Sequence, residues 1–156
     1  MPAVSRRFDR IPPDDPRLLE GSRLFNAGEF FASHEVWESL WHEVAGPERE
    51  LLQGLIQLTA AYHHRTRGNA TGARYLYTRG RARLARWAPR HAGIGIAAFL
   101  AQIDRDFRRG RRRSQGVLRP QLTISARPSR TRDKGRSRAG TRGSSPLSLC
   151  RSSARG

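Results

Sequence analysis

The sequence predicts an all-α protein: a compact bundle of four to five helices with short connections, followed by a disordered basic C-terminal tail. Apolar residues recur at intervals of three and four, which is the period of a helix and not that of a strand. Glycine, proline and asparagine divide the chain into segments of the length of ordinary helices. All twelve aromatic residues precede Gly110, so the candidate core lies in the first 109 residues.

The first helix is predicted to follow Asp14-Asp15-Pro16, where an acidic cap precedes a proline near the first helical position. It runs to Gly28, because glycine favours the left-handed turn that closes a helix. A second helix is predicted over about 29–45 and ends at Gly46-Pro47. Its apolar side carries Phe30, Phe31, Val36, Trp37, Leu40, Trp41 and Val44.

Three further helices are expected by the same criteria. The third follows Pro47 and ends at Gly68, and Asn69 can cap the fourth. The fifth follows Ala88-Pro89 and ends before Gly110. The apolar positions are Leu51, Leu52, Leu55, Ile56, Leu58 and Tyr62 in the third helix, Ala73, Leu76, Tyr77, Leu84 and Trp87 in the fourth, and Ile96, Phe99, Leu100, Ile103 and Phe107 in the fifth.

Charge divides the chain into a helical domain over residues 8–109 and a tail over residues 110–156. The whole chain carries a net charge of +17. The tail holds thirteen basic residues and one acidic residue among many serines and glycines. Such a composition cannot bury enough apolar surface to offset the entropy lost on ordering, so we expect the tail to be disordered. An alternative is that the tail is an unselected or frame-shifted extension in a GC-rich gene.

Several classes of protein are excluded by composition. The single cysteine, Cys150, excludes an intramolecular disulfide framework and a cysteine-based zinc site. No apolar run approaches the roughly 20 residues that span a bilayer, so no membrane partner is expected. The first residues lack the apolar stretch of a secretory signal, which favours a cytoplasmic protein. The sequence leaves the oligomeric state open.

The second helix carries the best candidate site. His34, Glu38 and His42 are spaced four residues apart, and Glu35 lies beside them. Side chains four residues apart lie about 5–6 Å from each other on one helical face, close enough to share a metal ion. Imidazole and carboxylate ligands suit a divalent transition metal such as Zn²⁺, Mn²⁺ or Fe²⁺. The spacing differs from the His-Glu-x-x-His pattern of zinc proteases, so protease chemistry is not predicted.

Further groups for this site would come from the third helix. His63 and His64 are additional candidate ligands, although adjacent helical side chains diverge by about 100°. Gln53 and Gln57 lie among apolar residues and need polar partners, which a carboxylate or histidine of the second helix could supply. A structural interpretation remains open, in which His34 and Glu38 form a hydrogen-bonded, half-buried pair inside the bundle.

The stretch from Phe25 to Leu76 resembles the prokaryotic family known as domain of unknown function 309. The hallmark of that family is His-x-x-x-Glu-x-x-Trp/Tyr, matched here by His34, Glu38 and Trp41. The flanking stretches at 25–30, 54–57, 68–69 and 72–73 also resemble the family pattern. The resemblance implies a compact all-helical fold and a suggested role of the motif in metal binding, but no established reaction. If the chain is a metal- or small-ligand-binding domain, we expect Trp41 to wall the pocket and Gln57 to orient the ligands.

Two rival functions follow from other features. The first is a helical protein–protein interaction module in which His34 and Glu38 are purely structural and exposed aromatic residues (Phe31, Tyr75, Trp87) bind a partner. The second is non-specific nucleic-acid binding through the basic tail, with the arginine-rich face of the fourth helix (Arg74, Arg81, Arg86). No nucleophile–base pair is visible, so the sequence predicts no reaction and leaves open whether the chain is an enzyme.

Overall fold

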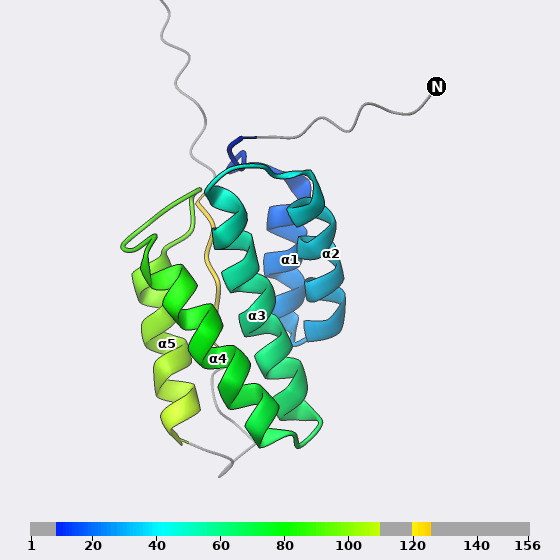
Figure 1. Cartoon of the computed structure of the whole chain (residues 1–156), viewed down its shortest axis with the longest axis vertical. Coiled ribbons are helices and arrows are strands. Elements are labelled where there is room, and N and C mark those ends of the chain that lie inside the picture. Colours follow the sequence, from blue (N-terminus) through cyan, green and yellow to red (C-terminus); the bar gives the residue numbers. More distant parts are fainter. Residues whose placement is uncertain (1–8, 110–119, 126–156) are drawn as a thin grey trace, which may run out of the picture.

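A computed structural model describes residues 9–109 and 120–125 of the chain. Within them the protein is all-α, as predicted, and successive helices run in opposite directions (Figure 1). The same residues form isolated β-bridges but no strand. None of the helices in this part of the chain combines the length and apolarity needed to cross a lipid bilayer. The helices are α1 (Pro16–Ala27), α2 (Phe30–Glu43), α3 (Glu48–Thr66), α4 (Ala70–Ala85) and α5 (Ile96–Arg109).

Local signals set both ends of α1 and the beginning of α4 where the sequence predicts them. The Asp15 carboxylate accepts a hydrogen bond from the Arg17 backbone N–H at 2.8 Å and caps α1, with Pro16 at the first helical position. Gly28 ends α1 in the left-handed conformation, with φ of 87°. Asn69 caps α4 by accepting a hydrogen bond from the Gly72 N–H at 2.9 Å.

The core is centred on the ring of Phe25 in α1. Its centroid lies 5.3 Å from that of Phe30, 5.4 Å from those of Tyr62 and Phe99, and 6.3 Å from that of Trp37. Four helices therefore contribute to one aromatic cluster. Because aromatic side chains bury the largest apolar areas, this cluster is a major source of the hydrophobic stabilisation of the bundle.

Two pairs of helices approach each other closely at glycines. A side chain at Gly21 of α1 would collide with the ring of Trp37 in α2, whose Nε1 atom donates to the Leu18 carbonyl at 3.3 Å. In the same way, Gly80 of α4 faces the backbone of α3 at Gly54. These contacts fix α1 against α2 and α3 against α4.

The tail departs from its expected disorder at residues 120–125. This segment lies along the bundle in an extended conformation (Figure 1), and Leu122 is only 2% exposed. The Leu122 N–H donates to Asn26 Oδ1 at 2.8 Å, while the Leu122 carbonyl accepts from Ser22 and Asn26 of α1. Burial of the Leu122 side chain and these hydrogen bonds to its backbone therefore hold the segment against α1. Residues 110–119 and 126–156, the rest of the expected tail, lie outside the described residues.

The link between α4 and α5 is also longer than expected, since it covers residues 86–95. It forms a turn in which His91 and Ile94 exchange backbone hydrogen bonds, with Ala92 and Gly93 at positive φ. The turn also packs against the 120–125 segment, because the Ser125 N–H donates to the Gly93 carbonyl at 2.9 Å. The extra length thus places His91 close to the beginning of α3.

Candidate functional site

His34 and Glu38 lie beside the buried face of α2, on its solvent-accessible flank. The buried face consists of Phe30, Ser33, Trp37 and Leu40 at helical spacing. The side chains of His34 and Glu38 are 29% and 48% exposed, and the His34 Nδ1 atom lies 3.8 Å from Glu38 Oε2. That separation is an ion-pair distance and too long for a hydrogen bond. The two side chains are therefore partly exposed neighbours with no direct hydrogen bond between these two atoms.

The other candidate ligands do not complete a metal cluster in the described residues. Glu35 and His42 are exposed on α2, and the His42 ring packs edge-on against Trp41. His63 faces α2, with its ring 5.7 Å from that of Phe31. His64 faces the α3–α4 turn instead, where its Nδ1 atom lies 3.0 Å from the Asn69 amide nitrogen. Across residues 9–109 and 120–125, no group of three or more histidine, cysteine or carboxylate side chains could hold a metal.

Trp41 and the α3 glutamines make contacts that the sequence did not indicate. The guanidinium of Arg49 lies over the half-buried Trp41 ring, 3.6 Å from its centroid. Gln57 Oε1 accepts a hydrogen bond from Arg83 Nε of α4 at 3.2 Å. The partner of Gln57 is therefore a cation of α4 rather than a carboxylate or histidine of α2. Gln53 lies one helical turn before Gln57 in α3 and is partly buried.

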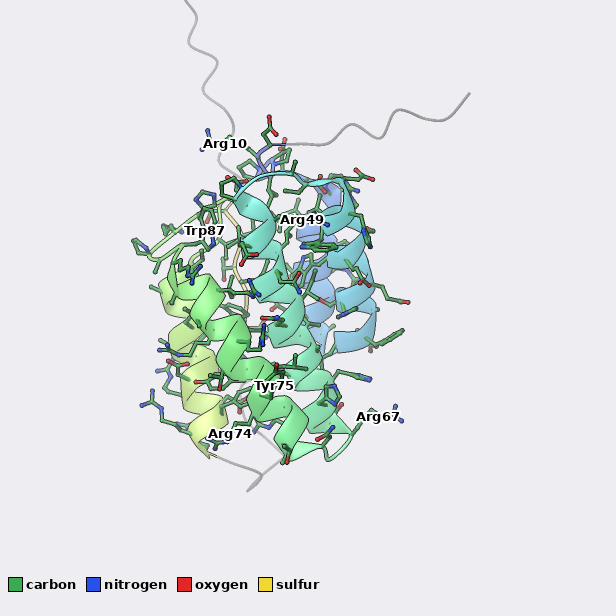
Figure 2. The ribbon with its side chains drawn as sticks, in the orientation of Figure 1. Arg10, Arg49, Arg67, Arg74, Tyr75 and Trp87 are labelled. Carbon is green, nitrogen blue, oxygen red and sulfur yellow. The ribbon has the colours of Figure 1, made fainter. Side chains whose placement is uncertain are left out.

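A second polar cluster surrounds Glu48, at the beginning of α3. Glu48 is only 6% exposed, and its carboxylate accepts a hydrogen bond from the Ile11 backbone N–H and lies 2.6 Å from His91 Nε2 and 3.7 Å from Arg10 Nε. It borders an open pocket of about 1010 Å³ at the end of the bundle where Figure 2 shows Arg10 and Trp87. The pocket is also lined by Pro12, Pro13, Arg90, Ala92, Gly93 and Ser125.

Sequence reasoning missed this cluster because its members are far apart in the chain. An acidic residue in the first turn of a helix is an ordinary local feature that complements the helix dipole. The only signal for Glu48 is that position directly after Pro47. Nothing local indicates that Glu48 would be buried, or that the α4–α5 link would bring His91 to it.

Two tyrosine–aspartate–arginine clusters attach α5 to α3 and α4. Asp106 accepts hydrogen bonds from Tyr62 Oη and Arg65 Nη1, both at 2.8 Å. Burial raises the pKa of the Tyr62 phenol far above its ordinary value, so this hydroxyl stays protonated and acts as a donor. The cluster therefore connects α5 to α3 through a neutral phenol and an arginine that both donate to one carboxylate.

The second cluster is centred on Asp104 of α5. Its carboxylate accepts two hydrogen bonds from Arg81, each at 2.8 Å, and one from Tyr77 Oη at 2.7 Å. Burial raises the pKa of Tyr77. The hydrogen bonds from Arg81 hold the pKa of Asp104 below its ordinary value, so the carboxylate is charged at neutral pH.

A similarity to a known protein family covers a segment of the first four helices. The sequence model of one family, described as Domain of unknown function (DUF309), matches residues 18–76. Residues 18–76, which are fewer than half of the chain, are therefore similar to this family. The matched segment runs from α1 into α4 and contains His34, Glu38 and Trp41, so the candidate site lies within the segment that is similar to the family. The match begins at Leu18, seven residues before Phe25, where the resemblance described in the sequence begins. No curated protein matches the chain.

Proposed function

We propose that this chain is a ligand-binding helical domain in which His34 and Glu38 together bind a divalent transition metal ion. The observation that carries the proposal is the 3.8 Å separation of the His34 Nδ1 and Glu38 Oε2 atoms, both on a solvent-accessible flank. Bonds of about 2.0–2.2 Å to one ion place two donor atoms roughly 3–3.5 Å apart. A small side-chain rotation therefore brings both atoms into the coordination sphere of a single ion.

The site is expected to be open. Two protein ligands occupy only part of the coordination sphere of Zn²⁺, Mn²⁺ or Fe²⁺, and water or an external ligand takes the remaining positions. Such a site binds a metal more weakly than a closed structural site with four protein ligands. Its accessible positions suit the binding of a small anionic molecule or of a partner side chain.

The proposal is tested by thermal melting of the full chain with Zn²⁺, Mn²⁺ and Fe²⁺ added separately. A metal that binds the folded state raises the melting temperature of the wild type, and this rise is absent in His34→Ala and in Glu38→Ala. Matched controls are His42→Ala and Glu35→Ala, which remove an imidazole and a carboxylate from the same helix and keep the rise. Every variant retains Cys150, so any zinc binding by that thiol is common to all of them.

Two results contradict the metal site. One is a wild-type melting temperature that none of the three metals changes. The other is an equal loss of the metal effect in the control variants, which would indicate non-specific binding to the acidic surface of α2.

An interaction module is a second candidate, favoured by the exposure of Phe31. This side chain is 58% exposed and lies one helical turn before His34. Tyr75 is similarly exposed, whereas Trp87 is half-buried against His91, with ring centroids 4.4 Å apart. If Phe31 binds a second copy of the chain, sedimentation shows a dimer that Phe31→Glu converts to a monomer. A wild-type monomer at high concentration excludes that partner.

A further inference from the structure

The α4 helix has an unusual balance of charge. Residues 70–85 contain several arginines and no acidic residue. Only two carboxylates occur between residues 65 and 109, and both already hold arginines: Asp106 pairs with Arg65, and Asp104 pairs with Arg81. Arg83 pairs with Glu50 of α3. The carboxylates close to α4 are therefore occupied.

Four exposed arginines remain on and next to α4. Within the part of the chain that the structure describes, Arg67, Arg74, Arg79 and Arg86 form no ion pair with a carboxylate. This set differs from the one that the sequence suggests, because Arg81 is engaged by Asp104. Unpaired guanidinium groups that share one surface repel each other, and a bound polyanion relieves that repulsion.

The geometry of α4 gathers three of these groups, those of Arg74, Arg79 and Arg86, on its outer side. At 100° per residue, positions 74, 75, 79 and 86 fall within an arc of about 140°, opposite the buried residues Ala73, Gly80 and Leu84. Arg74 and Arg86 are twelve residues apart, which corresponds to about 18 Å along the helix. Figure 2 shows Arg67, Arg74 and Tyr75 toward the end of the bundle where α3 turns into α4.

An aromatic ring lies within this set of cations. Tyr75 is 59% exposed, although tyrosine rings in folded proteins commonly pack against other side chains. Arg79 Nη1 donates a hydrogen bond to Tyr75 Oη at 2.8 Å, and its guanidinium carbon lies 5.4 Å from the ring centroid. Arg79 therefore restrains the ring in its exposed position, and we name Arg74, Tyr75, Arg79 and Arg86 the α4 basic face.

We propose that the α4 basic face binds single-stranded nucleic acid. Its arginines neutralise successive phosphates, and the Tyr75 ring stacks on an unpaired base. An acidic peptide would satisfy the charges but has no planar group for the ring. A duplex would also satisfy the charges, but its bases are already stacked and leave Tyr75 without a partner. The combination of unpaired arginines and a restrained, exposed ring thus favours a single strand.

The test measures the binding constant K of the full chain for a fluorescently labelled oligothymidine of roughly 15 nucleotides. Binding is monitored by fluorescence anisotropy at a series of salt concentrations. The variant Arg74→Gln/Arg86→Gln removes two charges from the α4 basic face. The matched control Arg105→Gln/Arg109→Gln removes two exposed charges from the outer side of α5. All variants keep residues 110–156, so the contribution of the basic tail is the same in each.

We expect the α4 variant to reduce the slope of log K against log salt by about 1.4, since each phosphate contact on a single strand contributes about 0.7. The α5 variant should leave the slope unchanged. Tyr75→Leu should weaken binding of the single strand on the order of tenfold with an unchanged slope, and should not affect a duplex of equal length. Thermal melting confirms that each variant is folded.

Three outcomes overturn the proposal. If the α4 and α5 variants lose affinity equally, binding follows net charge and the tail. If Tyr75→Leu changes nothing, or weakens the duplex as much as the single strand, no base stacks on the ring. In a competition assay, polyglutamate and unlabelled oligothymidine are each added to the complex of the full chain with labelled oligothymidine. If polyglutamate displaces the label as effectively as oligothymidine does, the face binds acidic proteins instead.

Discussion

Replacing Gly80 by alanine should force α3 and α4 apart at their closest contact. A Cβ atom at this position would lie 2.9 Å from the Gly54 carbonyl oxygen, 2.9 Å from Leu58 Cγ and 3.0 Å from the Leu58 backbone nitrogen. Ordinary contacts are longer than about 3.4 Å, and two of these three atoms belong to the backbone of α3. The helix axis must therefore shift, because a rotamer change cannot remove the collision.

Two opposing terms set the size of the effect. Alanine is favoured over glycine in a helix by about 1 kcal/mol. Overpacking in a core costs roughly 1–3 kcal/mol, and occasionally more where the backbone must move. Since the collision here is with backbone atoms, the upper value applies. We expect Gly80→Ala to lower the free energy of unfolding by about 2 kcal/mol.

Urea denaturation of the full chain, monitored by circular dichroism, measures the difference in the free energy of unfolding between Gly80→Ala and the wild type. The matched control is Ala82→Gly, at an exposed position of the same helix, which measures the propensity term alone and should cost about 1 kcal/mol. The reasoning is refuted if Gly80→Ala is neutral or more stable than the wild type. That result would mean that α3 and α4 separate without loss, and that the close approach does not hold the bundle together.

Two further predictions concern buried polar contacts. Asp104→Asn should lower the free energy of unfolding by about 1–2 kcal/mol at neutral pH, because it weakens the hydrogen bonds from Arg81, a side chain that is itself partly exposed. The folded-state pKa of Asp104 is below its ordinary value, so its contribution is present above about pH 4 and disappears as the pH falls through the lower folded value. Denaturation at a series of pH values should therefore show wild type and variant converging in acid, and a constant gap would contradict this origin. Ser33→Ala should cost about 1–2 kcal/mol, because the fully buried Ser33 hydroxyl donates to the Gly21 carbonyl at 2.7 Å. Ser39→Ala, which removes an exposed hydroxyl bonded to the backbone of its own helix, should change stability by less than about 0.5 kcal/mol, and equal losses in a thermal melt would contradict the assignment.

The candidate site was predictable to the extent that it lies within one helix. The spacing of His34 and Glu38 fixes their proximity, since residues four apart on a helix are neighbours wherever the helix packs. Contributions from another helix depend on how far each helix is rotated about its axis. Gln57 accordingly bonds to Arg83 of α4, and His64 faces Asn69 at the α3–α4 turn.

The sequence by itself determined the helices and most of their ends. Asp15, Gly28 and Asn69 act through bonds to residues a few positions away, so their effects are the same in any tertiary structure. The aromatic residues likewise mark the core, because burial of apolar surface depends chiefly on composition and period.

Only the tertiary structure decided the contacts between residues far apart in the chain. Leu122 packs in the core, and Asn26, nearly a hundred positions earlier, supplies both a donor and an acceptor to its backbone. Glu48 is buried because the α4–α5 link brings His91 to it. In the described part of the chain, Arg81 pairs with Asp104, whereas Arg74, Arg79 and Arg86 form no ion pair. Each of these outcomes depends on the relative placement of whole helices, which local sequence patterns do not encode.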